Sequence, residues 1–248
     1  MNTFQLHFDG KYWETVEINS DRELVVREAI YVVQDDHASV CLVQIYEDDF
    51  PFISALELRR LYSHMYNLVT PNQALFLRSR LACGTFEKLR HRISPVLFEK
   101  APVYINLYFS EVSELDTTER RSFRVYIDEL PHSDPIIPPY GGVKQVTIKN
   151  IDIYGTDETV LRPTSDSTLS PILNAIEVYQ VKDQKDGPDR DQISNIGTRR
   201  SDLQIRLAFD LRPSLWNTKI IISVTYSVII NMHSYKHDKG HVISSHKD

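Results

Sequence analysis

Cysteine is scarce in this chain, which has 248 residues and two cysteines, Cys41 and Cys83. Two cysteines cannot supply the disulfide framework of a small secreted scaffold, so a hydrophobic core must stabilise the fold. Cys41 lies in the apolar run SVCLV, where we expect a small buried side chain. A single bridge between the two cysteines is the alternative.

Glycine is also rare, and the signatures of common enzyme classes are missing. The chain has 8 glycines, and it contains no phosphate-binding glycine loop, no GxSxG elbow and no HExxH helix. These absences argue against nucleotide-dependent enzymes, hydrolases with a nucleophile elbow, and zinc proteases. We therefore predict no enzyme, no catalytic residue and no cofactor.

A surplus of positive charge and a long hydrophobic run are missing too. The formal net charge is −6, whereas nucleic acids and anionic lipids select clustered Lys and Arg, so we predict no nucleic-acid partner. No apolar run reaches the roughly 20 residues that span a bilayer. The nearest, IIISVTYSVII at Ile220–Ile230, is rich in β-branched residues, and we interpret it as a strand. The N-terminus carries no secretory signal, so we expect an intracellular chain or one whose beginning is missing.

Alternating apolar and polar residues dominate the first two thirds of the chain. The segments VYINLYF, SFRVYID and KQVTIKNI each place apolar side chains on one face. Stretches rich in Pro, Asp, Ser and Gly separate them, as turns do between short strands. We predict an all-β fold of antiparallel β-sandwiches, because each apolar strand face must meet another sheet. Helical patterns are confined to PNQALFLRSRL at 71–81 and a patchy stretch at 189–211.

One strand pattern occurs twice, as PFISALELR from Pro51 and as PILNAIEVYQV from Pro171. In both copies the apolar residues share one face, while Glu57 and Glu177 point to the other. The echo indicates two copies of one β domain, each ending on the same strand. We predict a first unit over 1–83, a second, truncated unit over 84–182, and a segment at 183–248 that lies outside the sandwiches and is poorly ordered.

The same repeat offers a candidate catalytic pair. A glycosidase needs two carboxylates that face each other across a cleft, and each copy supplies one, Glu57 and Glu177. Because equivalent positions in two separate domains do not share a cleft, we interpret both as outward-facing strand residues.

Two further groups have the composition of metal ligands. The acidic run Glu47-Asp48-Asp49 could bind calcium, although three consecutive carboxylates are more typical of a solvated loop. Four histidines near the C-terminus have a spacing that could hold zinc on a helix, although Gly240 argues against that helix. They are His233, His237, His241 and His246. We favour the solvated interpretation for both groups and predict no metal site.

Aromatic residues in or near turns could stack on sugar rings. The candidates are Tyr12, Trp13, Tyr46, Tyr140 and Tyr154. Most tyrosines of a β protein are half-buried strand residues, so the pattern does not choose among them, and the ligand-binding residues stay unassigned.

Six segments, in chain order, carry a family resemblance. They are GKYWETVEI, EAIYVVQDDHASVCLV, PFISALELR, VYINLYFSEV, RSFRVYID and LSPILNAIEVYQVKD. Together they resemble the malectin-like ectodomain of plant receptor-like kinases, particularly the leucine-rich repeat group. The resemblance covers about Phe4 to Asp183, and its most specific parts are the two closing-strand motifs.

The resemblance implies two malectin-type sandwiches in tandem and a non-enzymatic module at the cell surface. Its expected ligand is a cell-wall carbohydrate or a peptide. Compared with the family, the early strands of the first sandwich and a long stretch before Val103 are missing, so we expect a receptor fragment. Two other roles are left open: pairing with an intact receptor ectodomain through exposed sheet edges, or a mis-spliced product without function.

Overall fold

The computed structural model describes residues 2–8, 11–20, 23–33, 37–62, 65–83, 100–154, 157–183, 203–208 and 219–227. Among these residues every regular element is a strand, and all strand pairs are antiparallel. The all-β prediction is therefore confirmed. No helix in the described part of the chain is long and apolar enough to cross a membrane.

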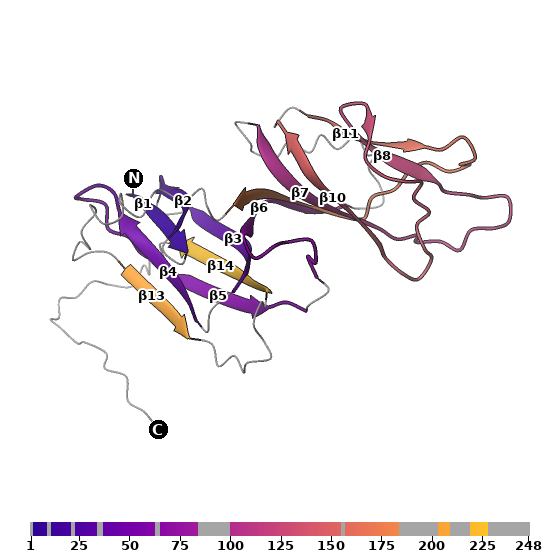
Figure 1. Ribbon diagram of the computed structural model, residues 1–248. Coiled ribbons are helices and arrows are strands. Elements are labelled where there is room, and N and C mark those ends of the chain that lie inside the picture. Colours follow the sequence, from indigo (N-terminus) through magenta and orange to yellow (C-terminus); the bar gives the residue numbers. More distant parts are fainter. Residues whose placement is uncertain are drawn as a thin grey trace, which may run out of the picture.

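The strands form three sheets (Figure 1). The four-stranded sheet has the order β13 (Leu203–Ala208), β4 (His37–Gln44), β1 (Asn2–Phe8) and β2 (Lys11–Ile18). The seven-stranded sheet has the order β10 (Lys144–Ile153), β7 (Ala101–Phe109), β12 (Ala175–Asp183), β6 (Gln73–Ala82), β3 (Leu24–Val32), β14 (Lys219–Ser227) and β5 (Ala55–Arg60). The three-stranded sheet has the order β11 (Thr159–Pro163), β8 (Phe123–Ile127) and β9 (Leu130–Pro131).

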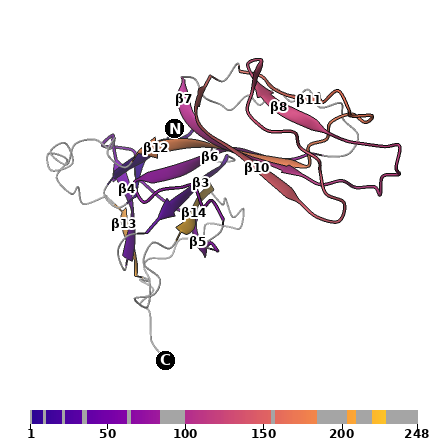
Figure 2. The same cartoon turned by 45° about the vertical axis from the view of Figure 1, so that its right-hand side comes forward.

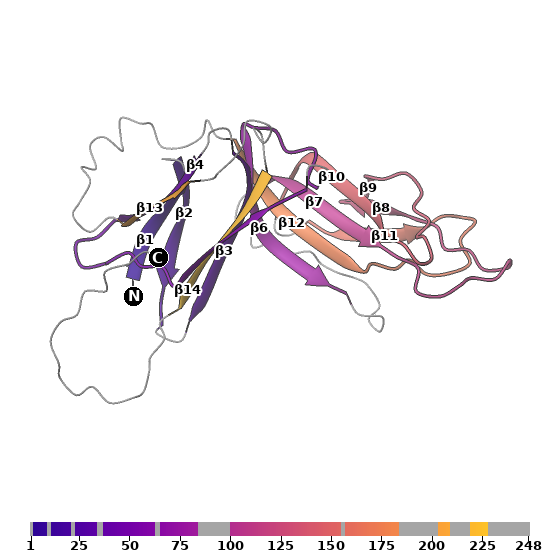
Figure 3. The same ribbon diagram turned by 90° about the horizontal axis from the view of Figure 1, so that it is seen from below.

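The first sandwich lies between the four-stranded sheet and one end of the seven-stranded sheet (Figure 3). Among the side chains that the structure describes, the buried residues of its core lie between 4 and 76 and include Phe4, Leu6, Trp13, Val16, Tyr31, Val40, Leu42 and Phe76. The apolar residues of β1 and β4 that alternate in the sequence, such as Phe4 and Leu6, lie fully buried here. The alternation in the sequence thus predicted the buried side chains of these strands correctly.

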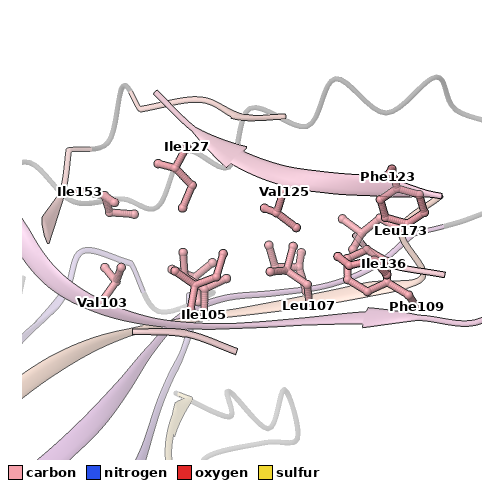
Figure 4. Packing of buried hydrophobic residues seen from close by; sticks show 13 residues of the cluster. Val103, Ile105, Leu107, Phe109, Phe123, Val125, Ile127, Ile136, Ile153 and Leu173 are labelled. Carbon is pink, nitrogen blue, oxygen red and sulfur yellow. The ribbon is translucent and has the colours of Figure 1, made fainter. Parts of the chain in front are cut away.

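The second sandwich lies between the other end of the seven-stranded sheet and the three-stranded sheet (Figure 4). Val103, Ile105 and Leu107 on β7 face Val125 and Ile127 on β8 across the core (Figure 4). All of its buried residues fall between 103 and 178. The two cores therefore follow the two halves of the chain, although the exact boundary between the units stays a prediction.

One sheet joins both sandwiches, because β6 of the first half pairs with β12 of the second half (Figure 2). On β12, Ile176 and Val178 pack in the second core, and Lys182 reaches Trp13 and Phe76 of the first core. We call this side of the seven-stranded sheet the front face. The opposite side, the back face, carries a third apolar cluster that includes Ile30, Leu75, Tyr104 and Tyr179.

Three β-bulges alter the strand alternation. In β6, Leu77 pairs with Tyr179 and Ser79 with Val178, so Arg78 is an extra residue. In β2, Trp13 is extra, and in β10 the extra residue is Asn150, which has a positive φ of 59°. Because a bulge reverses the faces of all later residues in its strand, the one in β6 moves Arg80 to the back face.

The helix expected over 71–81 is wrong, since Gln73–Ala82 forms β6. Its residues have high helix propensity, but both faces of β6 are covered: Leu75 packs on the back face and Phe76 on the front. The expectation that 183–248 lies outside the sandwiches is wrong for two stretches. Leu203–Ala208 pairs with β4, and Lys219–Ser227 fills the slot between β3 and β5.

Other expectations for the C-terminal segment have mixed outcomes. The apolar run at 220–230 is a strand over its described part, as predicted. The helical pattern at 189–211 is wrong for Leu203–Ala208, and its other residues, like the four histidines, lie outside the described residues. Cys41 and Cys83 are both half-buried and are not bridged.

Candidate functional site

A row of polar side chains crosses the back face of the seven-stranded sheet. Strand pairing aligns Arg80, Glu177, Asn106 and Thr147 on four neighbouring strands. Hydrogen bonds from Arg80 to Glu28 on β3 extend the row toward β5. From β5 to β10 its members are Glu57, Arg59, Glu28, Arg80, Glu177, Asn106, Tyr108, Thr147 and Gln145. We call this set the back-face row.

Glu177 is the centre of the row and is only 8% exposed. Its carboxylate accepts hydrogen bonds from Arg80 Nε at 2.8 Å, from the Tyr108 hydroxyl at 2.9 Å and from the Tyr66 hydroxyl at 3.0 Å. Tyr66 and Arg80 belong to the segment that forms the first sandwich, and Tyr108 belongs to β7 of the second. The buried charge is thus fully hydrogen-bonded, which a carboxylate needs away from water.

The segment after β5 covers Glu177 and closes this part of the back face. Leu61, Tyr66 and Val69 from that segment pack in the back-face cluster. The Tyr66 hydroxyl also lies 3.1 Å from the Tyr179 hydroxyl, and Tyr66 has a left-handed φ of 49°. That backbone conformation costs a non-glycine residue on the order of 1–2 kcal/mol. The hydrogen bonds and packing of Tyr66 must offset this cost, so its position is strongly specified.

The electrostatics of the row favour an ionised Glu177. Burial alone would raise the pKa of Glu177, but hydrogen bonds from Arg80 and Tyr108 and the charge of Arg80 outweigh it, so that the pKa is lowered. Burial, as the largest cause, raises the pKa of Tyr66 to about 12, and burial next to Glu177 also raises the pKa of Tyr108. The site therefore combines a fixed carboxylate with protonated tyrosine hydroxyls.

The two ends of the row are more exposed than its centre. At β5, Arg59 donates two hydrogen bonds to Glu57, of 2.7 and 2.9 Å. At β10, Gln145 and Thr147 donate to the side-chain oxygen of Asn106, at 2.9 and 2.8 Å. Between them, the Arg80 side chain is 41% exposed. The row thus presents hydrogen-bonding groups to solvent at its two ends and at Arg80, while its centre at Glu177 is covered.

The structure corrects the interpretation of Glu57 and Glu177. We assigned them to two separate units, and both lie on the same face of one sheet. Glu57 is exposed as predicted, whereas Glu177 is buried, because the segment after β5 covers it. Four inter-strand steps separate the two residues, which places them ~19 Å apart. Paired glycosidase carboxylates lie about 5 to 9.5 Å apart, so these two cannot act together on one glycosidic bond.

The five aromatic candidates do not form one platform. Trp13 is 2% exposed and packs against Phe76 in the first core, at 5.4 Å between ring centroids. Tyr46, Tyr140 and Tyr154 are exposed, but they lie respectively after β4, before β10 and after β10. Tyr12 is half-buried beside Lys182, with 5.6 Å between the ammonium and the ring centroid.

The acidic run at 47–49 belongs to a turn. Asp49 accepts a hydrogen bond from the backbone N–H of Thr3 at 2.9 Å, so its carboxylate fixes this turn to β1. Among the residues that the structure describes, no group of three or more His, Cys, Asp or Glu side chains is arranged to hold a metal ion.

Sequence reasoning missed most of the back-face row. Arg80 lay in a segment interpreted as helical, and the bulge that places it beside Glu177 has no sequence signature. Asn106 and Tyr108 could have been found, because they occupy the non-core face of a strand whose alternation was clear. Tyr66 comes from a loop, and no periodic pattern indicates its contact with Glu177.

Comparison with known proteins identifies the family. The model of the malectin-like domain matches this chain twice, over residues 1–96 and 87–181, so the chain belongs to the malectin-like domain family. The double match agrees with the internal repeat and with the two cores.

Relatives from Arabidopsis thaliana match most of the chain. The uncharacterized protein At1g24485 is 26% identical over 72% of this chain and 46% of its own length. A putative leucine-rich repeat receptor-like protein kinase, At2g19210, is 26% identical over 76% of this chain and 28% of its own length. The LRR receptor-like serine/threonine-protein kinase IOS1 is 24% identical over 78% of this chain and 28% of its own length. The chain thus spans less than half the length of these relatives. No solved structure shows significant similarity to it.

Proposed function

We propose that this chain is a non-catalytic binding module that recognises an extended, uncharged saccharide along the back-face row. The observation that carries the proposal is the row itself: hydrogen-bonding side chains on each of the six strands of this sheet whose side chains the structure describes, with exposed groups at both ends. Sugars are held by such arrays of donors and acceptors on a preformed surface. A continuous sheet supplies that surface with little freedom to rearrange.

The length of the row suits a polymer. From β5 to β10 there are six inter-strand steps, so the row extends over ~29 Å. A chain laid across the strands would meet Arg59 and Glu57 at one end, Arg80 in the middle and Gln145 at the other end. Affinity should therefore increase with oligosaccharide length until the ligand spans the row.

The charge balance of the row favours a neutral ligand. Arg59 is paired with Glu57, and Arg80 is paired with both Glu28 and Glu177. Each guanidinium of the row is already bound to a carboxylate. An acidic polymer would have to displace these carboxylates, whereas hydroxyl groups can share the same donors and acceptors.

The context of this module is proposed to be the cell surface. Relatives that match over most of the chain are named receptor-like protein kinases. A ligand-binding domain of such a receptor would lie outside the membrane, and this chain would contribute recognition without kinase activity.

The test is direct binding by titration calorimetry, using neutral oligosaccharides of increasing length and peptides of matched size. The variant Arg59→Ala should weaken oligosaccharide binding about 3- to 10-fold, because a charged donor is lost. The matched control is Arg60→Ala, the next residue of β5, which alternation places on the front face. Binding of peptides but not saccharides, or equal effects of the two variants, would contradict the proposal.

A further inference from the structure

A second polar cluster lies on the front face, between the two cores, where β2, β3, β6 and β12 meet. We call it the basic cluster. Its charged members are Arg27, Arg78, Lys182 and Glu14. They stand beside the uncharged Tyr12 and Gln180. The side chains of Arg27, Arg78 and Glu14 are 19 to 30% exposed, so the cluster is recessed but reaches solvent.

A single carboxylate serves two guanidiniums in this cluster. Glu14 Oε1 lies 3.2 Å from Arg78 Nη1, and Glu14 Oε2 lies 3.1 Å from Arg27 Nε. The Arg27 Nε atom is buried, and its contact with Glu14 lacks hydrogen-bond geometry. Arg78 additionally donates from Nε to the Gln180 side-chain oxygen at 3.1 Å. These contacts fix the direction of both guanidiniums but neutralise only one of the two charges.

Lys182 adds a third cation that no carboxylate binds within the described part of the chain. Its Nζ donates to the backbone oxygen of Trp13 at 2.9 Å and lies 5.0 Å from the Phe76 ring centroid. An ammonium has three donors, and this hydrogen bond uses one of them. Burial, followed by repulsion from Arg78, lowers the pKa of Lys182 despite the opposing effect of Glu14. Among the described residues, burial and the charge of Arg78 thus outweigh the attraction of Glu14 at Lys182.

Two β-bulges build this arrangement. Trp13 is the extra residue of β2, and an extra residue is left out of the strand ladder, which makes its carbonyl oxygen available to Lys182. Arg78 is the extra residue of β6, and it faces Glu14 and Gln180 on the front side. The position of the cluster therefore depends on the backbone conformation of β2 and β6 as well as on its side chains.

We infer that the basic cluster binds a carboxylate group of a small acidic ligand. Three cations and one carboxylate leave a surplus of two positive charges in a recessed position, and a monoanion reduces this surplus to one. Guanidinium groups that are held in a fixed direction suit the planar geometry of a carboxylate. The cluster lies on the opposite face from the back-face row, so this inference does not depend on the proposed saccharide function.

The experiment uses the full chain and four probes: D-galacturonate, D-galactose, N-acetyl-L-glutamic acid α-amide and inorganic sulfate. Binding is measured by calorimetry and by the shift of the unfolding midpoint. We expect the carboxylate probes to bind, galactose to bind much more weakly, and added salt to weaken carboxylate binding. Binding of galacturonate alone assigns the carboxylate to a sugar acid, and binding of the N-acetylglutamic acid α-amide alone assigns it to an acidic peptide.

Two variants test the cluster itself. Lys182→Met keeps the apolar stem and removes the ammonium, and it should weaken carboxylate binding at least about 10-fold. Arg27→Gln, at a position whose side chain is 30% exposed, should act in the same direction and provides the test if Lys182→Met does not fold. Arg60→Gln, an exposed cation elsewhere on the sheet, is the control and should change nothing. Equal binding of galactose and galacturonate, tighter binding of sulfate, or unchanged binding in both cluster variants would overturn the inference.

Discussion

Replacing Glu177 by alanine should destabilise the protein far more than the same change at Glu57, its counterpart in the repeat. Glu177 is buried and accepts hydrogen bonds from Arg80, Tyr108 and Tyr66. Removing one partner of a buried ion pair costs about 3–5 kcal/mol. The lower end, about 3 kcal/mol, applies because Arg80 is part-exposed and keeps its pair with Glu28. Glu57 is exposed and pairs with Arg59 at the surface, so its loss should have no measurable effect.

The assay is urea-induced unfolding of the two variants and the parent chain, followed by far-UV circular dichroism and tyrosine fluorescence. If the transition is two-state, the midpoint for Glu177→Ala should fall while the slope stays constant. In a thermal scan the same loss corresponds to roughly 6–12 °C for a domain of this size. Equal midpoints for Glu177→Ala and Glu57→Ala would refute the reasoning, since it rests entirely on the different burial of two equivalent residues.

Three further predictions concern pH and backbone conformation. The pKa of Glu177 is lowered in the folded protein. Its contribution to stability is therefore complete above the ordinary glutamate pKa and disappears as the pH falls through the lowered pKa of the folded state. In an acid titration, the stability of Glu177→Gln should depend less on pH than that of the parent chain. The pKa of Tyr66 is raised to about 12, so its stabilising effect should be lost as the pH rises above about 10, and Tyr66→Phe should reduce this alkaline loss. At the bulge of β10, Asn150 has a φ of 59°, and Asn150→Val should cost about 1–2 kcal/mol in chemical unfolding while Asn150→Gly should be close to neutral.

Period-two alternation predicted the strands with one apolar face correctly. Val103, Ile105 and Leu107 lie in the second core because β7 follows the simple rule that alternate side chains share a face. The same rule fails for β6, where Leu75 and Phe76 are both buried on opposite faces. A strand that is covered on both sides has a continuous apolar sequence. Such a sequence does not differ in its periodicity from that of a buried helix segment of the same length. Tertiary pairing with β3 and β12, which no local pattern encodes, decided in favour of the strand.

The back-face row was harder to predict than the cores, because it depends on contacts between distant segments. Alternation assigned Glu177 to the non-core face, and this is right, but burial of that face depends on Tyr66, which is separated from Glu177 by 111 residues. The bulge at Arg78 reverses the direction of Arg80 and has no signature in the sequence. The sequence can thus assign a charged residue to one face of a strand, but it does not show which distant residues form hydrogen bonds with it.

The duplication and the continuous sheet together explain why one site uses both halves of the chain. Glu57 and Glu177 hold the same position in the two copies, and pairing of β6 with β12 converts these copies into two points on one surface. The copies have since diverged in role: Glu57 stays exposed beside Arg59, while Glu177 fixes Arg80 of the other half. An isolated first unit would keep Arg80 and Glu28 but lose the central carboxylate and every member of the row beyond it. The surface proposed to bind saccharide therefore exists only when both malectin-like units fold together.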